Sequence, residues 1–146
     1  MADNQKHSQY FEGILQLRDP TKKVLDVFLK VLKERKDVRI MKEVKLKNGY
    51  DFYLTSNKAL IIIGKKLYNR FGGEYKISRK LHTVRKQTSK KLYRVTVMFR
   101  PPKFKAGDIV KVKGQELRVK ILKRKVLGID IESGKKVWFE YGDVRS

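Results

Sequence analysis

The pattern of apolar residues changes in kind at Pro101-Pro102, and this change limits the folds open to the chain. Before these prolines, segments with a two-residue apolar period alternate with segments whose apolar residues recur every three or four positions, which predicts strands mixed with helices. After them only short strand patterns remain, at close spacing. We therefore predict an α+β region at residues 10–100 and an all-β region at residues 101–146, preceded by a flexible tail at residues 1–9.

The first region is predicted to contain one sheet with two helices packed on one of its faces. Asp19-Pro20 indicates a helix start with Asp19 as the N-cap, Ser56 is the expected cap of the second helix, and Gly72-Gly73 is its expected end. The order strand, helix, strand, strand, helix, strand, strand favours a two-layer α+β sandwich. The expected strands lie at about residues 10–17, 38–46, 50–54, 74–84 and 91–100, and the first helix at about residues 20–36.

Local details of the first region also follow from residue types. Gly13 inside the first strand indicates a bulge or a close backbone approach. Asn48-Gly49 predicts a tight hairpin turn. The apolar positions expected to share one side are Val38, Ile40, Val44 and Leu46 on a strand, Val24, Leu25, Phe28, Val31 and Leu32 on the first helix, and Leu60, Ile63, Leu67 and Phe71 on the second.

The second region is predicted to be a small SH3-like barrel, because its length and its short strands suit one. A unit of this size is marginally stable unless it docks on a neighbour. Trp138, with Phe139 and Tyr141, is expected to close the barrel core, and the alternative interpretation is a base-stacking platform. The expected strands lie at residues 108–113, 116–122, 126–131 and 135–141, with turns at Gly114, Gly128 and Ser133-Gly134.

The chain offers no set of residues suited to catalysis or to metal binding. It has no cysteine, which excludes disulfides, thiolate metal sites and cysteine nucleophiles, and its only imidazoles are His7 and His82. Asp130 and Glu132 would project from one side of a strand, but two carboxylates alone do not make a catalytic site. We therefore expect a non-enzymatic protein with no cofactor, no metal and no small-molecule substrate. No apolar run approaches the roughly 20 residues that span a bilayer, so we expect a cytoplasmic protein with no membrane partner.

Basic residues are concentrated in the middle of the chain, whose formal net charge is +22. Between Glu74 and Asp108 there is no acidic residue, and Lys and Arg occupy eleven of the thirty-three positions from Tyr75 to Gly107. Half of the net charge therefore lies in less than a quarter of the chain. Self-repulsion of this size does not help folding, whereas each cation placed on a phosphate releases condensed counterions. The charge predicts a polyanionic partner, with nucleic acid as the leading class.

The densest basic cluster falls on the predicted hairpin formed by residues 74–84 and 91–100. A hairpin that reaches out from a sheet can lay cations along a phosphate backbone, while aromatic neighbours such as Tyr75 and Tyr93 stack on unpaired bases. The alternative is a solvated basic surface without a ligand, although such a surface normally mixes both signs of charge. The candidate RNA-binding residues of the hairpin are Lys76, Arg79, Lys80, His82, Arg85, Lys86, Lys90, Lys91 and Arg94, with His82 also readable as a lone surface histidine.

A second basic cluster lies in the predicted barrel. Alternation sends Lys111 and Lys113 outward and Val110 and Val112 inward, so that one face of the barrel becomes cationic. The alternative is that these lysines only protect an edge strand from pairing with another chain. The candidate RNA-binding residues here are Lys111, Lys113, Lys120, Lys123, Arg124 and Lys125, with Arg118 close by.

Three separate stretches carry a resemblance to a known family. Tyr10–Arg18, Val38–Glu43 leading into Gly49–Tyr53, and Tyr75–Leu81 together resemble, in order and spacing, an archaeal-type member of the Nmd-three family, the adaptors of large ribosomal subunits. The likeness runs from about Tyr10 to the end of the chain. It implies a domain similar to a large-subunit ribosomal protein at residues 10–100, followed by an SH3-like domain similar to the first half of translation factor five-A.

The resemblance also implies a function and a partner. Family members bind the intersubunit side of the large subunit, over the transfer-RNA exit region near its mobile stalk, during late maturation. The expected partners are ribosomal RNA together with the stalk or neighbouring ribosomal proteins, and the factor is expected to act as a monomer. The zinc ribbons usual in the family cannot be carried over, because this sequence has no cysteine. Two alternatives remain, namely a general RNA-binding or translation-factor-like module and a protein-binding module that grips an acidic partner.

Overall fold

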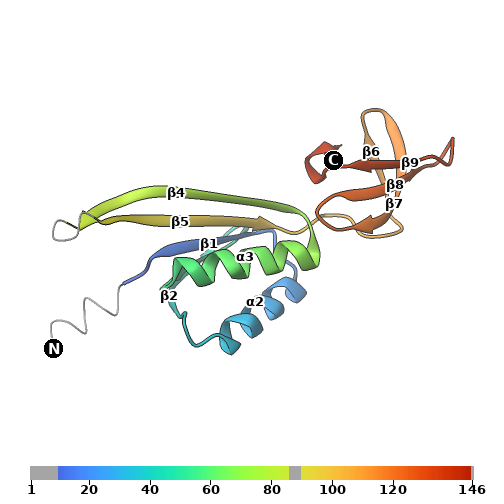
Figure 1. Ribbon diagram of the computed structural model, residues 1–146. Coiled ribbons are helices and arrows are strands. Elements are labelled where there is room, and N and C mark those ends of the chain that lie inside the picture. The colour runs from blue at the N-terminus through green and yellow to red at the C-terminus, as the bar shows by residue number, and fades with distance from the viewer. Residues whose placement is uncertain (1–9, 86–89, 146) are drawn as a thin grey trace.

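The computed structural model describes residues 10–85 and 90–145, which form two sheets and two helices (Figure 1). The first sheet carries both helices on one of its faces, and the second sheet lies beyond the end of the first (Figure 1). The predicted tail at residues 1–9 and the predicted turn at residues 86–89 fall outside the described residues.

The first sheet has five strands in the order β2-β3-β1-β5-β4. Strand β1 pairs antiparallel with β3 and parallel with β5, so the sheet is mixed. The predicted order of strands and helices and the α+β class are confirmed. The bounds are β1 (Gly13–Arg18), α2 (Lys22–Glu34), β2 (Ile40–Leu46), β3 (Gly49–Leu54), α3 (Asn57–Phe71), β4 (Glu74–Arg85) and β5 (Lys90–Arg100).

One hydrophobic core joins both helices to the same face of this sheet. Phe28 of α2 packs against Phe52 of β3, with ring centres 4.7 Å apart. The Ser56 hydroxyl accepts a hydrogen bond from the amide of Ala59, which confirms the predicted cap of α3. The core is formed by Leu15, Leu17, Val24, Phe28, Val38, Phe52, Leu54, Ala59, Leu60, Ile63, Leu67, Val95, Val97 and Phe99.

The close approach predicted at Gly13 is confirmed. A Cβ atom there would lie 2.6 Å from the Val95 carbonyl oxygen and would also meet the Asn57 side chain. Only glycine therefore lets β1 pass between β5 and the start of α3.

The start of the first helix differs from the prediction. Thr21 is the N-cap of α2, and its hydroxyl accepts a hydrogen bond from the amide of Val24 at 3.2 Å. Asp19 takes a left-handed backbone conformation with φ of 47°, and its carboxylate lies 3.3 Å from the Arg100 guanidinium. The Asp19 side chain therefore turns toward β5 and cannot cap the helix.

The first hairpin departs from the prediction in two ways. One extra residue, Met41, shifts the register between Ile40 and Lys42, so Val44 and Leu46 lie on the face opposite to Ile40. The turn consists of residues 47–48, and Gly49 already belongs to β3. A Cβ atom at Gly49 would collide with the Leu17 carbonyl, and the φ of 147° also favours glycine.

The second sheet is antiparallel, with the strand order β10-β6-β7-β8-β9. Strands β9 and β10 are its two edges, so the pairing within residues 101–145 leaves the sheet open and does not make a closed barrel. The last strand has two residues and follows a 3-10 helix at Tyr141–Asp143. The bounds are β6 (Ile109–Val112), β7 (Gln115–Leu122), β8 (Val126–Asp130), β9 (Lys136–Phe139) and β10 (Val144–Arg145).

The prediction that Trp138 closes the core of the second region is wrong. Successive residues of a strand point to opposite faces, and Phe139 takes the buried position, so Trp138 faces solvent with 59% of its surface exposed. The second core is completed by Phe104 and Tyr141, which stack at 5.8 Å. Its buried members are Val110, Val112, Leu117, Val119, Val126 and Phe139.

Two further predictions for the second region are also corrected. Gly128 lies inside β8 and not in a turn. Glycine is needed there because a Cβ atom would lie only 3.0 Å from the Leu117 and Phe139 side chains across the core. Asp130 and Glu132 do not form an acidic pair on a strand. The Asp130 carboxylate accepts hydrogen bonds from the backbone amides of Glu132 and Ser133, and these bonds hold the turn after β8.

The second sheet contacts the C-terminal end of α3. The Tyr68 hydroxyl donates to the Arg124 carbonyl at 3.2 Å, and the Arg124 guanidinium donates to the Asn69 side-chain oxygen at 3.1 Å. Gly72 lies beneath the Tyr141 hydroxyl, which donates to the Lys123 carbonyl. This contact is the support that so small a sheet needs.

Candidate nucleic-acid interface

Strands β4 and β5 continue as a two-stranded ribbon past the rest of the first sheet. Strand β1 pairs with β5 only over Val95–Phe99, whereas β4 and β5 remain paired as far as Arg85 and Lys90. Figure 1 shows this ribbon reaching away from the second sheet, and we name residues 80–85 and 90–94 the arm. A ribbon with no layer beneath it can be reached by a ligand from both faces.

The register of the ribbon sorts its cations between two faces. Lys80 lies opposite Arg94, and Lys76 lies opposite Met98, on the face without helices. Arg79 lies opposite the buried Val95 and so belongs to the helix side. The predicted hairpin cluster is therefore divided between the two sides of the ribbon.

No described acid neutralises the exposed cations of β4. The side chains of Lys76, Arg79 and Lys80 are exposed, and in residues 10–85 and 90–145 the ion pairs of the protein involve other cations. Because they lack internal partners, these charges are available to an external polyanion. Backbone register places Arg85 opposite Lys90 and Val84 opposite Lys91, and Lys86 lies outside the described residues.

Arg94 is held differently from the other arm cations. Its guanidinium lies over the ring of Phe11 at 3.9 Å from the ring centre, and it donates a long hydrogen bond of 3.5 Å to the Phe11 carbonyl. The Phe11 ring in turn meets Tyr53 edge-on at 4.8 Å. Arg94 thus anchors the arm to the start of β1, a role that the sequence pattern did not reveal because Phe11 is distant along the chain.

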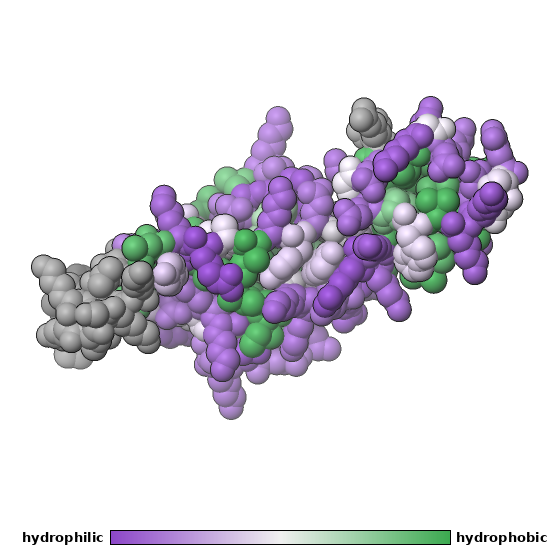
Figure 2. Space-filling view, turned by 45° about the horizontal axis from the view of Figure 1, so that its top comes forward, coloured by the Kyte–Doolittle hydropathy of each residue, from purple (hydrophilic) through white to green (hydrophobic). Residues whose placement is uncertain are grey.

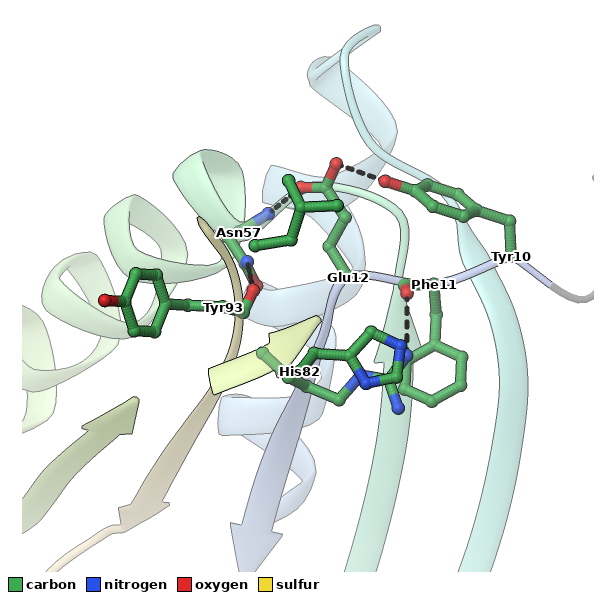
Figure 3. A pocket seen from close by; sticks show the side chains of 8 residues that line it. Tyr10, Phe11, Glu12, Asn57, His82 and Tyr93 are labelled. Atoms are coloured by element: carbon green, nitrogen blue, oxygen red, sulfur yellow. Dashed lines mark hydrogen bonds between the residues drawn. The ribbon is translucent and has the colours of Figure 1, made fainter. Parts of the chain in front are cut away.

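A pocket of about 390 Å³ opens at the root of the arm, where β5 separates from the segment before β1 (Figure 3). In its lining, the Glu12 carboxylate accepts two hydrogen bonds, one of 2.7 Å from the backbone amide of Asn57 and one from the Tyr10 hydroxyl. His82 occupies the extra position of a β-bulge between Leu81 and Thr83. The lining residues are Tyr10, Phe11, Glu12, Asn57, His82, Leu92, Tyr93 and Arg94.

The lining of this pocket combines flat rings with a hydrogen-bond acceptor. Figure 3 shows the His82 imidazole beside the Phe11 ring, with the Glu12 side chain reaching toward Asn57 and Tyr10. Rings and guanidinium planes stack on bases, and a carboxylate accepts the amino hydrogens of a base edge. No group of three metal-ligating side chains is found in the part of the chain that the structure describes.

The second cluster occupies the outward side of the second sheet and its turns. Lys111 is exposed while Val110 and Val112 are buried, which confirms the predicted alternation along β6. Lys113 is also exposed, but it lies in the turn after β6 with φ of 49°. Lys120 is exposed at a bulge between Val119 and Ile121. The turn after β7 contributes the exposed Lys123, Arg124 and Lys125, of which Arg124 is engaged with Asn69.

The two predicted clusters do not form one compact site. The arm and the second sheet lie at opposite ends of the elongated molecule (Figure 1). Figure 2 shows hydrophilic side chains over most of the length, with apolar surface also exposed on the second sheet. A partner that touches both clusters must therefore be as long as the protein itself.

Fold and surface together define a basic α+β protein with exposed cations at both ends. The profile of the family described as "NMD3, second domain" matches residues 10–100, and the chain belongs to the NMD3 family. A search of the curated proteins gave no match. The resemblance seen in the sequence is thereby confirmed at the level of the family.

Family membership settles several predictions. The NMD3 family consists of non-enzymatic ribosome export adaptors, so the expectation of a protein without catalytic activity is confirmed. Membership implies a factor of 60S subunit export or maturation, with the 60S subunit as its partner. In the described residues, no helix is both long and apolar enough to cross a membrane.

Proposed function

We propose that this protein binds large-subunit ribosomal RNA over the exit-site region during late subunit maturation and covers that surface until it is released. The observation that carries this proposal is the set of exposed cations on β4, Lys76, Arg79 and Lys80, which no described acid neutralises. Phosphate contacts by such residues supply most of the affinity of RNA-binding proteins that do not read sequence. Family membership makes the large subunit the natural source of that RNA.

The arm and its pocket have separate tasks in this proposal. Lys76, Arg79 and Lys80 contact the RNA backbone, together with Arg85, Lys90 and Lys91 of the arm and with Lys86, which follows Arg85 in the sequence. The pocket at the arm's root receives one unpaired base, stacked beside His82 and Phe11 with its edge toward Glu12. Because RNA sequence is read mainly at unpaired bases, this pocket is where the factor would recognise its position on the subunit.

The second region provides the other contact. We propose a second domain at residues 101–146, of SH3-like type with an open edge, because its core is distinct from that of residues 10–100. Its outward cations approach RNA beyond the reach of the arm. The whole factor acts as a monomer on cytoplasmic ribosomes. The contributing residues are Lys111, Lys113, Lys120, Lys123 and Lys125.

The test is co-sedimentation with purified large subunits over a series of salt concentrations. Replacing Lys76, Arg79 and Lys80 together by Gln should weaken binding and reduce the salt slope by about 0.7 to 0.9 for each phosphate that the variant no longer neutralises. A matched control replaces three exposed lysines of α2, Lys22, Lys23 and Lys30, by Gln, which removes the same charge from another surface. Equal slopes for the two triple variants would remove these three cations of β4 from the interface.

Crosslinking to large subunits then locates the contact. Nucleotides crosslinked near the exit site support the proposal, and crosslinks spread evenly over subunit RNA would point instead to a general RNA-binding module. Binding that survives nuclease treatment would favour a protein partner.

A further inference from the structure

The outer face of the second sheet carries an aligned apolar row. Ile121 of β7 lies opposite Leu127 of β8, and Leu127 lies opposite Trp138 of β9, so the three side chains stand side by side. Trp138 is 59% exposed and Ile121 is 42% exposed. We name Ile121, Leu127 and Trp138 the tryptophan row.

This row is not part of the core of the second region. Leu127 is buried, with 8% exposure, yet it does not belong to the core cluster that Phe139 completes on the other face. Folding gains little from an indole left in solvent, so the position of Trp138 calls for another reason.

Two cations lie on one side of the row, on the same face of the sheet. Arg118 lies opposite Ile129, and Ile129 lies opposite Lys136. These three residues form a second row beside the tryptophan row, two residues away along β8 and β9. Arg118 and Lys136 are exposed, and neither pairs with an acid within residues 10–85 and 90–145. The Arg118 guanidinium donates to the Gly107 carbonyl at 3.1 Å. Proteins that hold single-stranded nucleic acid combine aromatic rings with neighbouring cations, as an exposed indole beside two cations does here.

We propose that Trp138 stacks an unpaired RNA base, with Arg118 and Lys136 on the adjoining phosphates. The inference rests on the proposed function, since large-subunit RNA is the partner, and it adds a contact that the cation clusters alone do not provide. The size of the row favours RNA over protein. A specific protein interface buries roughly 800 Å² on each partner, far more than two exposed side chains offer, whereas one indole covers one base.

The first measurement uses intrinsic fluorescence, because Trp138 is the single tryptophan of the chain. Single-stranded polyadenosine should quench its emission as the bases stack. A duplex RNA with the same number of phosphates should bind through the cations and leave the emission nearly unchanged. Equal quenching by both RNAs would overturn the inference.

The second measurement compares variants by anisotropy of a labelled single strand. Trp138→Ala should bind roughly 5-fold to 150-fold more weakly, the range found for removal of one base stack. Trp138→Phe should recover part of this affinity because phenylalanine also stacks. The matched control is Ile131→Ala, which removes an exposed apolar side chain outside the row, and circular dichroism checks that all variants fold. Equal affinity of Trp138→Ala and the control would overturn the inference.

Co-sedimentation with large subunits separates this inference from the proposed function. If subunits bind the wild type and Trp138→Ala equally, the stacking contact is wrong while the proposed function stands. If single-stranded RNA quenches Trp138 but subunits do not bind the wild type, stacking is supported and the ribosomal role fails. A blue shift without quenching on subunit binding would identify a protein occupant and overturn the stacking contact.

Discussion

The two sheets bury their inner faces by different means. The first has two helices laid across it and a core of fourteen buried side chains, whereas the second has six and is covered only by its own strands and by flanking segments such as the one holding Phe104. The larger core can support a ribbon that extends without a layer beneath it. The smaller one needs the contact with α3 through Tyr68, Arg124 and Tyr141.

This difference separates stability from binding. In the first region the binding surface extends beyond the core, so that changes to Lys76 or Lys80 should leave folding intact. In the second region Arg124 and Lys123 belong both to the basic cluster and to the contact with α3. Damage to that contact should therefore disturb both the fold and the position of the second set of cations.

The largest expected effect is the uncoupling of α2 from the sheet. Phe28→Ala removes a fully buried ring that packs on Phe52, and it should reduce the free energy of unfolding by about 3–5 kcal/mol. Urea denaturation followed by circular dichroism measures this change. The control is Leu29→Ala on the same helix, where the side chain is 46% exposed. A similar destabilisation in both variants would contradict the packing of α2 described above.

A smaller effect is expected at the junction between the two regions. Gly72 has φ of 72°, and a Cβ there would meet the Tyr141 hydroxyl and lie 2.6 Å from the Lys123 carbonyl. Gly72→Ala should cost about 1–3 kcal/mol for a backbone conformation, φ of 72° and ψ of −159°, that is essentially restricted to glycine, and displacement of these two groups adds to that cost. Gly107→Ala is the matched control, because Gly107 has φ of 96° but no atom within 4 Å of a Cβ. Equal thermal shifts for the two variants would show that the regions do not meet at Gly72.

Much of the first region could be predicted from local patterns. Helix α3 was predicted closely from the spacing of Leu60, Ile63 and Leu67, from the Ser56 cap and from the glycines after Phe71. Each of these signals depends only on residues that are close together in the sequence. The bulge at Met41 depends on pairing with the neighbouring strand, and the ion pair between Asp19 and Arg100 joins residues that are distant along the chain. No local pattern reports such partners.

The candidate site was predictable in charge but not in arrangement. The acid-free window contains Lys76, Arg79 and Lys80, which no described acid neutralises, but also Arg100, which pairs with Asp19 and Glu74. The division of Lys80 and Arg79 between two faces required the register of β4 with β5. The exposure of Trp138 could have been predicted from the sequence. Adjacent strand residues cannot both face the core, so burial of Phe139 already excludes Trp138 from it.

The smallest expected effect concerns the hydroxyl that joins the second sheet to α3. Burial raises the pKa of Tyr141 to about 12, against a smaller opposite effect of the Gly73 amide. The unfolded chain loses this proton near its ordinary pKa of about 10, whereas the folded protein keeps it to about pH 12. Between these values the native state binds more protons, so its stability should fall as pH rises and should be fully retained below pH 10.

Tyr141→Phe tests this interpretation at both ends of the range. At neutral pH the variant lacks the hydrogen bond to the Lys123 carbonyl and should be about 0.5–1.5 kcal/mol less stable. Between pH 10 and 12 its stability should decline less steeply than that of the wild type, because it has no phenol to ionise at the junction. Urea midpoints measured for both proteins across this range give the comparison. Parallel pH profiles would mean that Tyr141 is solvated and that the second sheet is held to α3 mainly by Tyr68 and Arg124.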